Sequence, residues 1–178
     1  LFLHGANDFN ILCGDTLRDP KILQNEHIAH FDCVVANPPF SLENWGAEAW
    51  KSDRYGRNIW GTPSDSCGDY AWLQHMVCSM RSLTGRMAVE LPQGVLFRGQ
   101  ESTYREALVN RDYIDAVFTL GDKIFYGTPL SPCFLIIRDR KPLERRGKVL
   151  FVDGAKVLTQ QRAQNILSDE DVNRLHQF

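Results

Sequence analysis

The chain has 178 residues, of which 43% are hydrophobic and 24% are charged, and its formal net charge is −2. This length suits one domain, and the composition excludes a disordered chain. The slightly acidic balance excludes a protein that grips nucleic acid through a broad basic surface of its own, and no window reaches the ~18 uninterrupted apolar residues of a membrane span.

The amino-terminal residues show no secretory signal pattern. Two strands are predicted in the first 40 residues. Residues 1–5 lack an initiator Met, so we expect the chain to begin inside a longer protein. Residues 10–13 are apolar and end at Gly14-Asp15, which predicts a strand followed by a loop. Residues 31–36 are almost continuously apolar, which predicts a strand covered on both faces, as in a parallel sheet.

Strands and helices alternate through the rest of the sequence. Residues 41–67 predict a long loop with a short helix around 42–50, and an apolar face predicts a helix over 69–83. Further strands are predicted at 86–91, 115–120, 133–137 and 149–152, and helices at 101–109 and after a capping box formed by Ser168 and Asp171. The alternation predicts an α/β domain whose ligands bind beyond the carboxyl ends of a largely parallel sheet.

The run Asn37-Pro38-Pro39-Phe40 follows the predicted buried strand directly. It resembles the N-P-P-[FY] motif of methyltransferases that act on planar nitrogen atoms. The exocyclic amine of adenine is a poor nucleophile because its lone pair is delocalised into the ring. Acceptance of both amine hydrogens by the Asn37 side-chain oxygen and the Pro38 carbonyl would localise that lone pair, while Pro39 would stiffen the turn. Phe40 would offer an aromatic face to a flipped-out base.

The alternative for this run is an Asn-Pro turn that only ends a strand, and the run by itself does not choose among DNA, RNA and protein-glutamine substrates. A second group is Gly14-Asp15-Thr16-Leu17. The resemblance implies that Asp15 accepts a hydrogen bond from the adenine amino group of S-adenosylmethionine, and that Asn37 and Pro39 also border this cofactor. A plain turn cap is the alternative for Asp15.

Neither the cysteines nor the densest group of basic residues predicts a functional site. The five cysteines are scattered without a C-x-x-C pair, which predicts reduced thiols and no metal site. The basic residues between 138 and 148 predict a solvated loop, with a phosphate-contacting loop as the alternative.

Nearly the whole chain resembles, in order, the modification subunit of type I restriction-modification systems. The stretches that carry this resemblance are 3–5, 14–17, 31–41, 44–46, 68–71, 74–76, 91–99, 125–128 and 148–153. The resemblance implies a Rossmann-like S-adenosylmethionine-dependent methyltransferase fold, with a mostly parallel sheet and an antiparallel strand near the C-terminal end. Residues 1–155 would be a partial catalytic domain without the amino-terminal strands of the cofactor loop, and residues 156–178 a helical extension.

The implied activity is methylation of the N6 amine of adenine in DNA, in the cytoplasm of a bacterium or archaeon and away from membranes. The implied partners are DNA and a DNA-specificity subunit, and participation of the restriction subunit stays open. Tyr70, Phe125 and Tyr126 are further candidates for contact with the substrate base, with ordinary aromatic packing as the alternative. The other functional hypotheses are an RNA or protein-glutamine N-methyltransferase and a non-catalytic, truncated assembly module.

Overall fold

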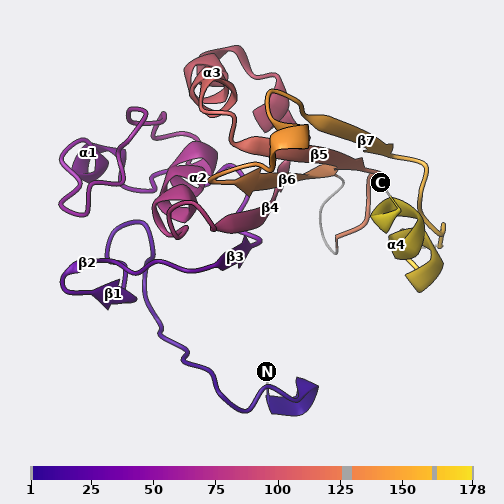
Figure 1. The fold of residues 1–178 in the computed structure, drawn as a ribbon, viewed down its shortest axis with the longest axis horizontal. Coiled ribbons are helices and arrows are strands. Elements are labelled where there is room, and N and C mark those ends of the chain that lie inside the picture. Colours follow the sequence, from indigo (N-terminus) through magenta and orange to yellow (C-terminus); the bar gives the residue numbers. More distant parts are fainter. Residues whose placement is uncertain (1, 126–129, 162–163, 178) are drawn as a thin grey trace.

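The computed structural model describes residues 2–125, 130–161 and 164–177, which form a mixed sheet with helices around it (Figure 1). The strands are β1 Leu23–Gln24, β2 His27–Ile28, β3 Cys33–Ala36, β4 Arg86–Pro92, β5 Ile114–Leu120, β6 Pro132–Arg138 and β7 Leu150–Gly154. The α-helices are α1 Ala47–Trp50, α2 Asp69–Cys78, α3 Ser102–Asn110 and α4 Asp169–His176. Short 3₁₀ turns are η1 Phe2–His4, η2 Gln93–Leu96, η3 Gly99–Glu101 and η4 Leu143–Arg145.

The main sheet has the strand order β3-β4-β6-β5-β7. The pairs β3/β4 and β5/β7 are parallel, and β6 runs antiparallel to both of its neighbours. Four strands therefore point in one direction and β6 alone opposes them, which confirms the predicted fold class. The carboxyl ends of β3, β4 and β5 consequently meet at one edge of the sheet.

The core lies between one face of the sheet and helices α2 and α3 (Figure 1). Alternate residues of β4 point to this face, and Met87, Val89 and Leu91 are buried there. Leu73 and Met76 from α2 and Leu108 from α3 belong to the same cluster. This packing fixes the level at which β3 and β4 end, and so fixes the loops that follow them.

The opposite face of β3 is uncovered, which differs from the prediction of a strand buried on both faces. Val35 is 73% exposed and Cys33 is also exposed. Here β3 is an edge strand, and only its α2 side is covered. The predicted strand at 10–13 is also absent: Ile11 and Leu12 are exposed in a segment that extends away from the sheet (Figure 1). Among the described residues, no strand lies beside this segment, so its backbone forms no ladder hydrogen bonds despite its apolar side chains.

Helix α2 ends at Cys78, five residues before the predicted end at 83. The N–H of Phe31 donates to the Ser79 carbonyl at 2.8 Å, and the N–H of Arg81 donates to the Phe31 carbonyl at 2.9 Å. This bridge beside β3 draws the chain out of the helix. The helix predicted around 42–50 is limited to α1 for the same kind of reason, since Asn44 N–H donates to the Asp65 carbonyl at 2.8 Å instead.

The carboxyl-terminal helix follows the sequence pattern closely. Ser168 and Asp171 form both bonds of the predicted capping box at the start of α4. The division of the chain at residue 155 stays a prediction. Within the described part of the chain, no helix combines the length and apolar character that crossing a membrane requires.

Candidate active site

The Asn37–Phe40 turn begins where β3 ends, at the carboxyl edge of the sheet. Asn37 and Pro39 are exposed, Pro38 is buried and Phe40 is half-buried. Among the described residues, the Asn37 side chain and the Pro38 carbonyl have no hydrogen-bond partner. Two oxygen acceptors on adjacent residues are therefore free at the edge where ligands of α/β sheets bind.

Asp15 closes the turn that follows the amino-terminal segment. One oxygen, Oδ1, accepts hydrogen bonds from the N–H groups of Leu17 at 3.1 Å and Arg18 at 3.0 Å. The other oxygen, Oδ2, has only a 3.5 Å contact with the Arg18 guanidinium, and the side chain is 49% exposed. Asp15 is thus a turn cap, and its second oxygen can still accept a hydrogen bond from a ligand.

A buried arginine fastens this turn to the rest of the protein. Arg57 donates to the carbonyl oxygens of Thr16 at 2.9 Å and Leu17 at 2.7 Å. Its guanidinium also pairs with Asp53 at 2.6 Å and lies 4.5 Å from the centre of the Trp50 ring. Arg57 gives no signal in the sequence, because residues 41–67 are predicted to be mostly a loop and no local pattern marks an arginine that will be buried.

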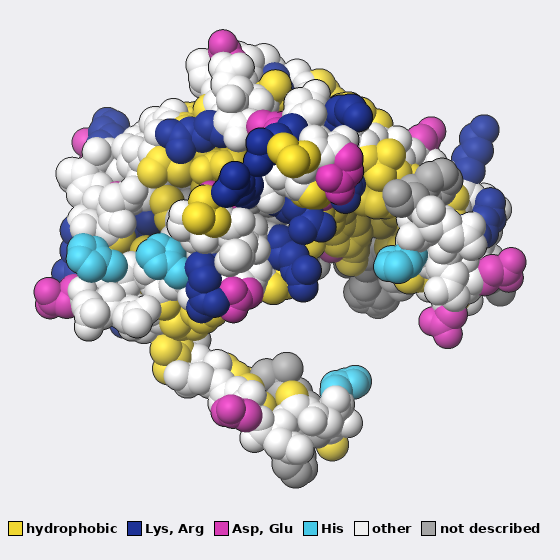
Figure 2. All heavy atoms as spheres, viewed as in Figure 1, with side chains coloured by type: hydrophobic (Ala, Val, Ile, Leu, Met, Phe, Trp, Pro, Cys, Tyr) yellow, Lys and Arg dark blue, Asp and Glu magenta, His cyan; other side chains and the backbone are white. Residues whose placement is uncertain are grey.

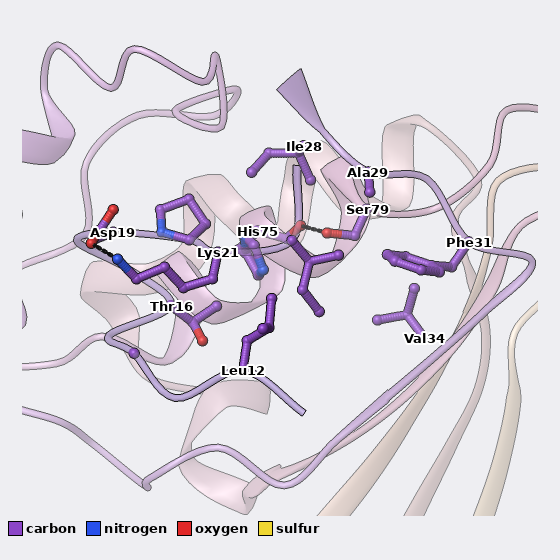
Figure 3. Close-up of a pocket in the computed structure, with 13 residues that line it drawn as sticks. Leu12, Thr16, Asp19, Lys21, Ile28, Ala29, Phe31, Val34, His75 and Ser79 are labelled. Carbon is purple, nitrogen blue, oxygen red and sulfur yellow. Dashed lines mark hydrogen bonds and ion pairs between the residues drawn. The ribbon is translucent and has the colours of Figure 1, made fainter. Parts of the chain in front are cut away.

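A cavity of about 210 Å³ lies against the turn that carries Asp15 (Figure 3). Leu12, Ile28, Phe31 and Val34 form apolar parts of its wall, and His75 of α2 adds a polar group. Burial, with the nearby positive charge of Arg57, lowers the pKa of His75 to about 4, so the ring is neutral near pH 7. Asp15 and Asn37 are not among the residues that line this cavity, but Gly14 and Thr16, on either side of Asp15, are.

A second buried cluster joins the Asn37–Phe40 turn to α2 and to the loop after β4. The N–H of Ser41 donates to Asp69 Oδ1 at 2.7 Å. Arg98 donates through Nη1 to Asp69 Oδ2 at 2.8 Å and to Glu101 at 3.1 Å, and through Nη2 to the Ser41 hydroxyl at 3.1 Å. In the sequence, Asp69 is the first residue of the predicted helix 69–83, and Arg98 belongs only to the matching stretch 91–99.

Cys67 completes this cluster. Its sulfur lies 3.3 Å from carboxylate oxygens of both Asp69 and Glu101, a spacing that could hold a metal ion. The Arg98 guanidinium already occupies the space between them, 3.1 Å from the sulfur. Burial raises the pKa of the Cys67 thiol to about 11, so the thiol is neutral. The guanidinium therefore serves as the cation of this cluster.

The predicted base-contacting aromatic residues fare differently. Tyr70 is 1% exposed, donates its hydroxyl hydrogen to the Val95 carbonyl at 2.9 Å and stacks on Tyr104. It faces the core, because it shares the buried face of α2, which favours the alternative of ordinary aromatic packing. Phe125 is half-buried in the segment after β5, and Tyr126 lies outside the described residues.

Ion pairs hold part of the basic segment 138–148, while Arg140, Arg146 and Lys148 are exposed, as expected of a solvated loop. Lys141 is buried and pairs with Asp112 at 2.6 Å, while Arg138 and Arg145 both pair with the buried Asp115. Figure 2 shows Lys and Arg side chains gathered near the middle of this view. Arg138 pairs in register with Arg86 at the start of β4, so this segment begins at the edge opposite Asn37.

The whole chain, residues 1–178, matches the family described as N-6 DNA Methylase. The type I restriction enzyme MjaVII methylase subunit of Methanocaldococcus jannaschii is 32% identical over 98% of this chain and 31% of its own length. The type I restriction enzyme HindI methylase subunit of Haemophilus influenzae is 28% identical over 84% of this chain and 32% of its own length.

A crystal structure of the type I restriction-modification system methyltransferase subunit from Streptococcus thermophilus superposes with a TM-score of 0.80 at 30% identity. The match covers 91% of this chain and 34% of that subunit. The EcoKI M protein superposes with a TM-score of 0.63 at 21% identity, over 92% of this chain and 32% of that protein. The chain thus spans about a third of the length of the relatives that it matches.

Proposed function

Because the chain belongs to the N-6 DNA methylase family, we propose that its protein transfers a methyl group from S-adenosylmethionine to the N6 amine of adenine in DNA. The observation that carries the proposal is the free pair of acceptors, the Asn37 side chain and the Pro38 carbonyl, at the carboxyl edge of the sheet. The similarity to type I methylase subunits supports a modification subunit of such a system.

The reaction needs no strong general acid or base from the protein. The cofactor supplies a methyl group bonded to a positively charged sulfur. Asn37 and Pro38 would accept the two amine hydrogens and so direct the nitrogen lone pair at the methyl carbon, which the cofactor would give up from its sulfur as the nitrogen bonds to it. The spare proton then leaves the nitrogen for water. Held in place before the substrate arrives, the acceptors stabilise the charge that develops on the nitrogen.

In this proposal the cofactor is contacted by Asp15, Asn37 and Pro39. The Oδ2 atom of Asp15 is available to accept a hydrogen bond, and the turn that presents it is fixed by Arg57. Phe40, half-buried beside the free acceptors, would stack on the flipped base, and Phe125 and Tyr126 stay candidates for a second aromatic wall.

The proposed partners are DNA and a DNA-specificity subunit, with the restriction subunit as a further member of the assembly. A formal net charge of −2 agrees with a protein whose grip on phosphates comes largely from a partner. Because its substrate is DNA, we place the protein in the cytoplasm of its cell. Residues 1–155 would be the catalytic part and residues 156–178 the extension.

The test is a transfer experiment with the full-length subunit and its specificity partner. Radiolabelled S-adenosylmethionine is offered separately with unmodified genomic DNA, total RNA and cell protein, and the labelled product is digested and identified. We expect label in N6-methyladenine from DNA. Label in RNA or in glutamine would replace the proposed substrate, and absence of label in all three would support a non-catalytic assembly role.

A further inference from the structure

The residue that follows the proposed catalytic turn has an unfavourable backbone conformation. Ser41 has a φ of 49°, in the left-handed region that residues other than glycine rarely adopt. Such a conformation is unfavourable and persists only where the surroundings impose it. The contacts of Ser41 are therefore the place to look for what holds the turn in shape.

Two side chains from distant elements impose this conformation. Asp69, the first residue of α2 and 0% exposed, accepts from the Ser41 N–H at 2.7 Å. Arg98, after β4, donates to the Ser41 hydroxyl at 3.1 Å and to the other oxygen of Asp69 at 2.8 Å. A carboxylate and a guanidinium thus clamp both the backbone and the side chain of one residue.

The loop after β4 is shaped to admit this arginine. A Cβ atom on Gly94 would lie 2.6 Å from Nε and 2.8 Å from Nη2 of Arg98, closer than such atoms approach. Glu101, also buried, holds the Nη1 side of the guanidinium at 3.1 Å. Burial alone would lower the pKa of Arg98. Its bonds to Asp69 and Glu101 have the larger, opposite effect, so the pKa is raised overall and the guanidinium stays charged.

We propose that Asp69 and Arg98 are the positioning residues that hold the Asn37–Phe40 turn in its reactive shape. Neither touches the reacting atoms. They act through Ser41, and Gly94 provides the space for the arginine. This inference rests on the proposed methyl transfer, because its readout is the rate at which the turn delivers an amine to the methyl group.

Three variants separate positioning from stability. Arg98→Lys keeps a positive charge among Cys67, Asp69 and Glu101, but one ammonium group lacks the planar fork that reaches Asp69 and Ser41 together. Gly94→Ala keeps every charged group and displaces the guanidinium; the φ of Gly94 is not in the left-handed region, so the backbone accepts alanine. Arg81→Ala is the control, because it removes an arginine whose ion pair with Asp32 is exposed.

The measurements use the full-length subunit with its specificity partner, S-adenosylmethionine, and genomic DNA from a strain that lacks the system. We expect Arg98→Lys and Gly94→Ala to lower the single-turnover rate of methyl transfer by about 100-fold, the cost of a misplaced reacting group, with cofactor Kd near wild type and a fall in Tm too small to explain the lost rate. Ser41→Ala, which loses only the hydroxyl contact, should fall between these variants and the control.

Wild-type rates in both Arg98→Lys and Gly94→Ala would overturn the inference. So would rates that fall only in step with Tm and cofactor affinity, because that pattern describes a structural cluster. Failure of the wild-type protein to label DNA would instead count against the proposed function, so the two failures are distinguishable.

Discussion

Arg57 and Asp53 form an ion pair 2.6 Å long in the interior, with side chains that are 1% and 6% exposed. The pair lies four residues apart in a segment with little regular structure, and the arginine extends from it to the turn that carries Asp15. A charge this deeply buried needs its partner, because water cannot replace it. The pair therefore ties the fold of residues 50–60 to the proposed cofactor contact.

Arg57→Met should destabilise the protein by about 3–5 kcal/mol, because it leaves the Asp53 carboxylate buried without a partner. The double variant Asp53→Leu/Arg57→Met should recover much of that loss in urea unfolding, yet still bind S-adenosylmethionine more weakly than wild type, since the Thr16 and Leu17 carbonyls have lost their donors. Arg81→Met, at an exposed pair, should cost under about 1 kcal/mol. Equal losses at both arginines would contradict this account.

Asp15→Asn separates the two roles of this side chain. The amide oxygen can still accept from the N–H groups of Leu17 and Arg18, so the turn and the Tm should be preserved. The oxygen left for the cofactor becomes a donor, and loss of a charged hydrogen bond worth about 1.5–3 kcal/mol should weaken cofactor binding roughly 10- to 100-fold. Calorimetry measures the change, and an unchanged Kd would leave Asp15 as a turn cap only.

The buried carboxyl group of Glu90 on β4 makes the stability of the fold depend on pH. It is 4% exposed, and burial raises its pKa from 4.5 to about 7. Between these values the unfolded chain has lost the proton that the folded chain keeps, so stability falls as pH rises from about 4.5 to about 7 and then levels off. Glu90→Gln should thus add about 3 kcal/mol at pH 8 and little at pH 4. A stabilisation equal at both pH values would rule out ionisation as its cause.

The five strands of the main sheet and the position of the Asn37–Phe40 turn could be predicted from sequence, because each depends on a short run of neighbouring residues. The apolar runs at 86–91, 115–120 and 133–137 each became a strand with bounds shifted by a residue. Asn37 follows such a run, and two prolines must end it, so the turn is placed by the chain itself.

The supporting residues could not be predicted, since they act over long separations in sequence. Arg57 reaches back 41 residues to Thr16, and Arg98 reaches back 57 residues to Ser41. A charged side chain gives no local sign that it will be buried. Tyr70 shows the converse: its place in the apolar period of α2 indicated a core residue, and its nearness to the motif suggested the base contact that the structure does not support.

The most direct test of the whole account is the Asn37→Ala variant of the full-length subunit with its specificity partner. Asn37 has no partner within the described residues, so its loss should leave the fold intact. With Asn110→Ala, at the exposed end of α3, as the matched control, we expect methyl transfer to DNA to disappear while cofactor binding largely survives, weakened only by the loss of the Asn37 contact because Asp15 and Pro39 are unchanged. Transfer at the wild-type rate in the Asn37→Ala protein would contradict the role assigned to the turn.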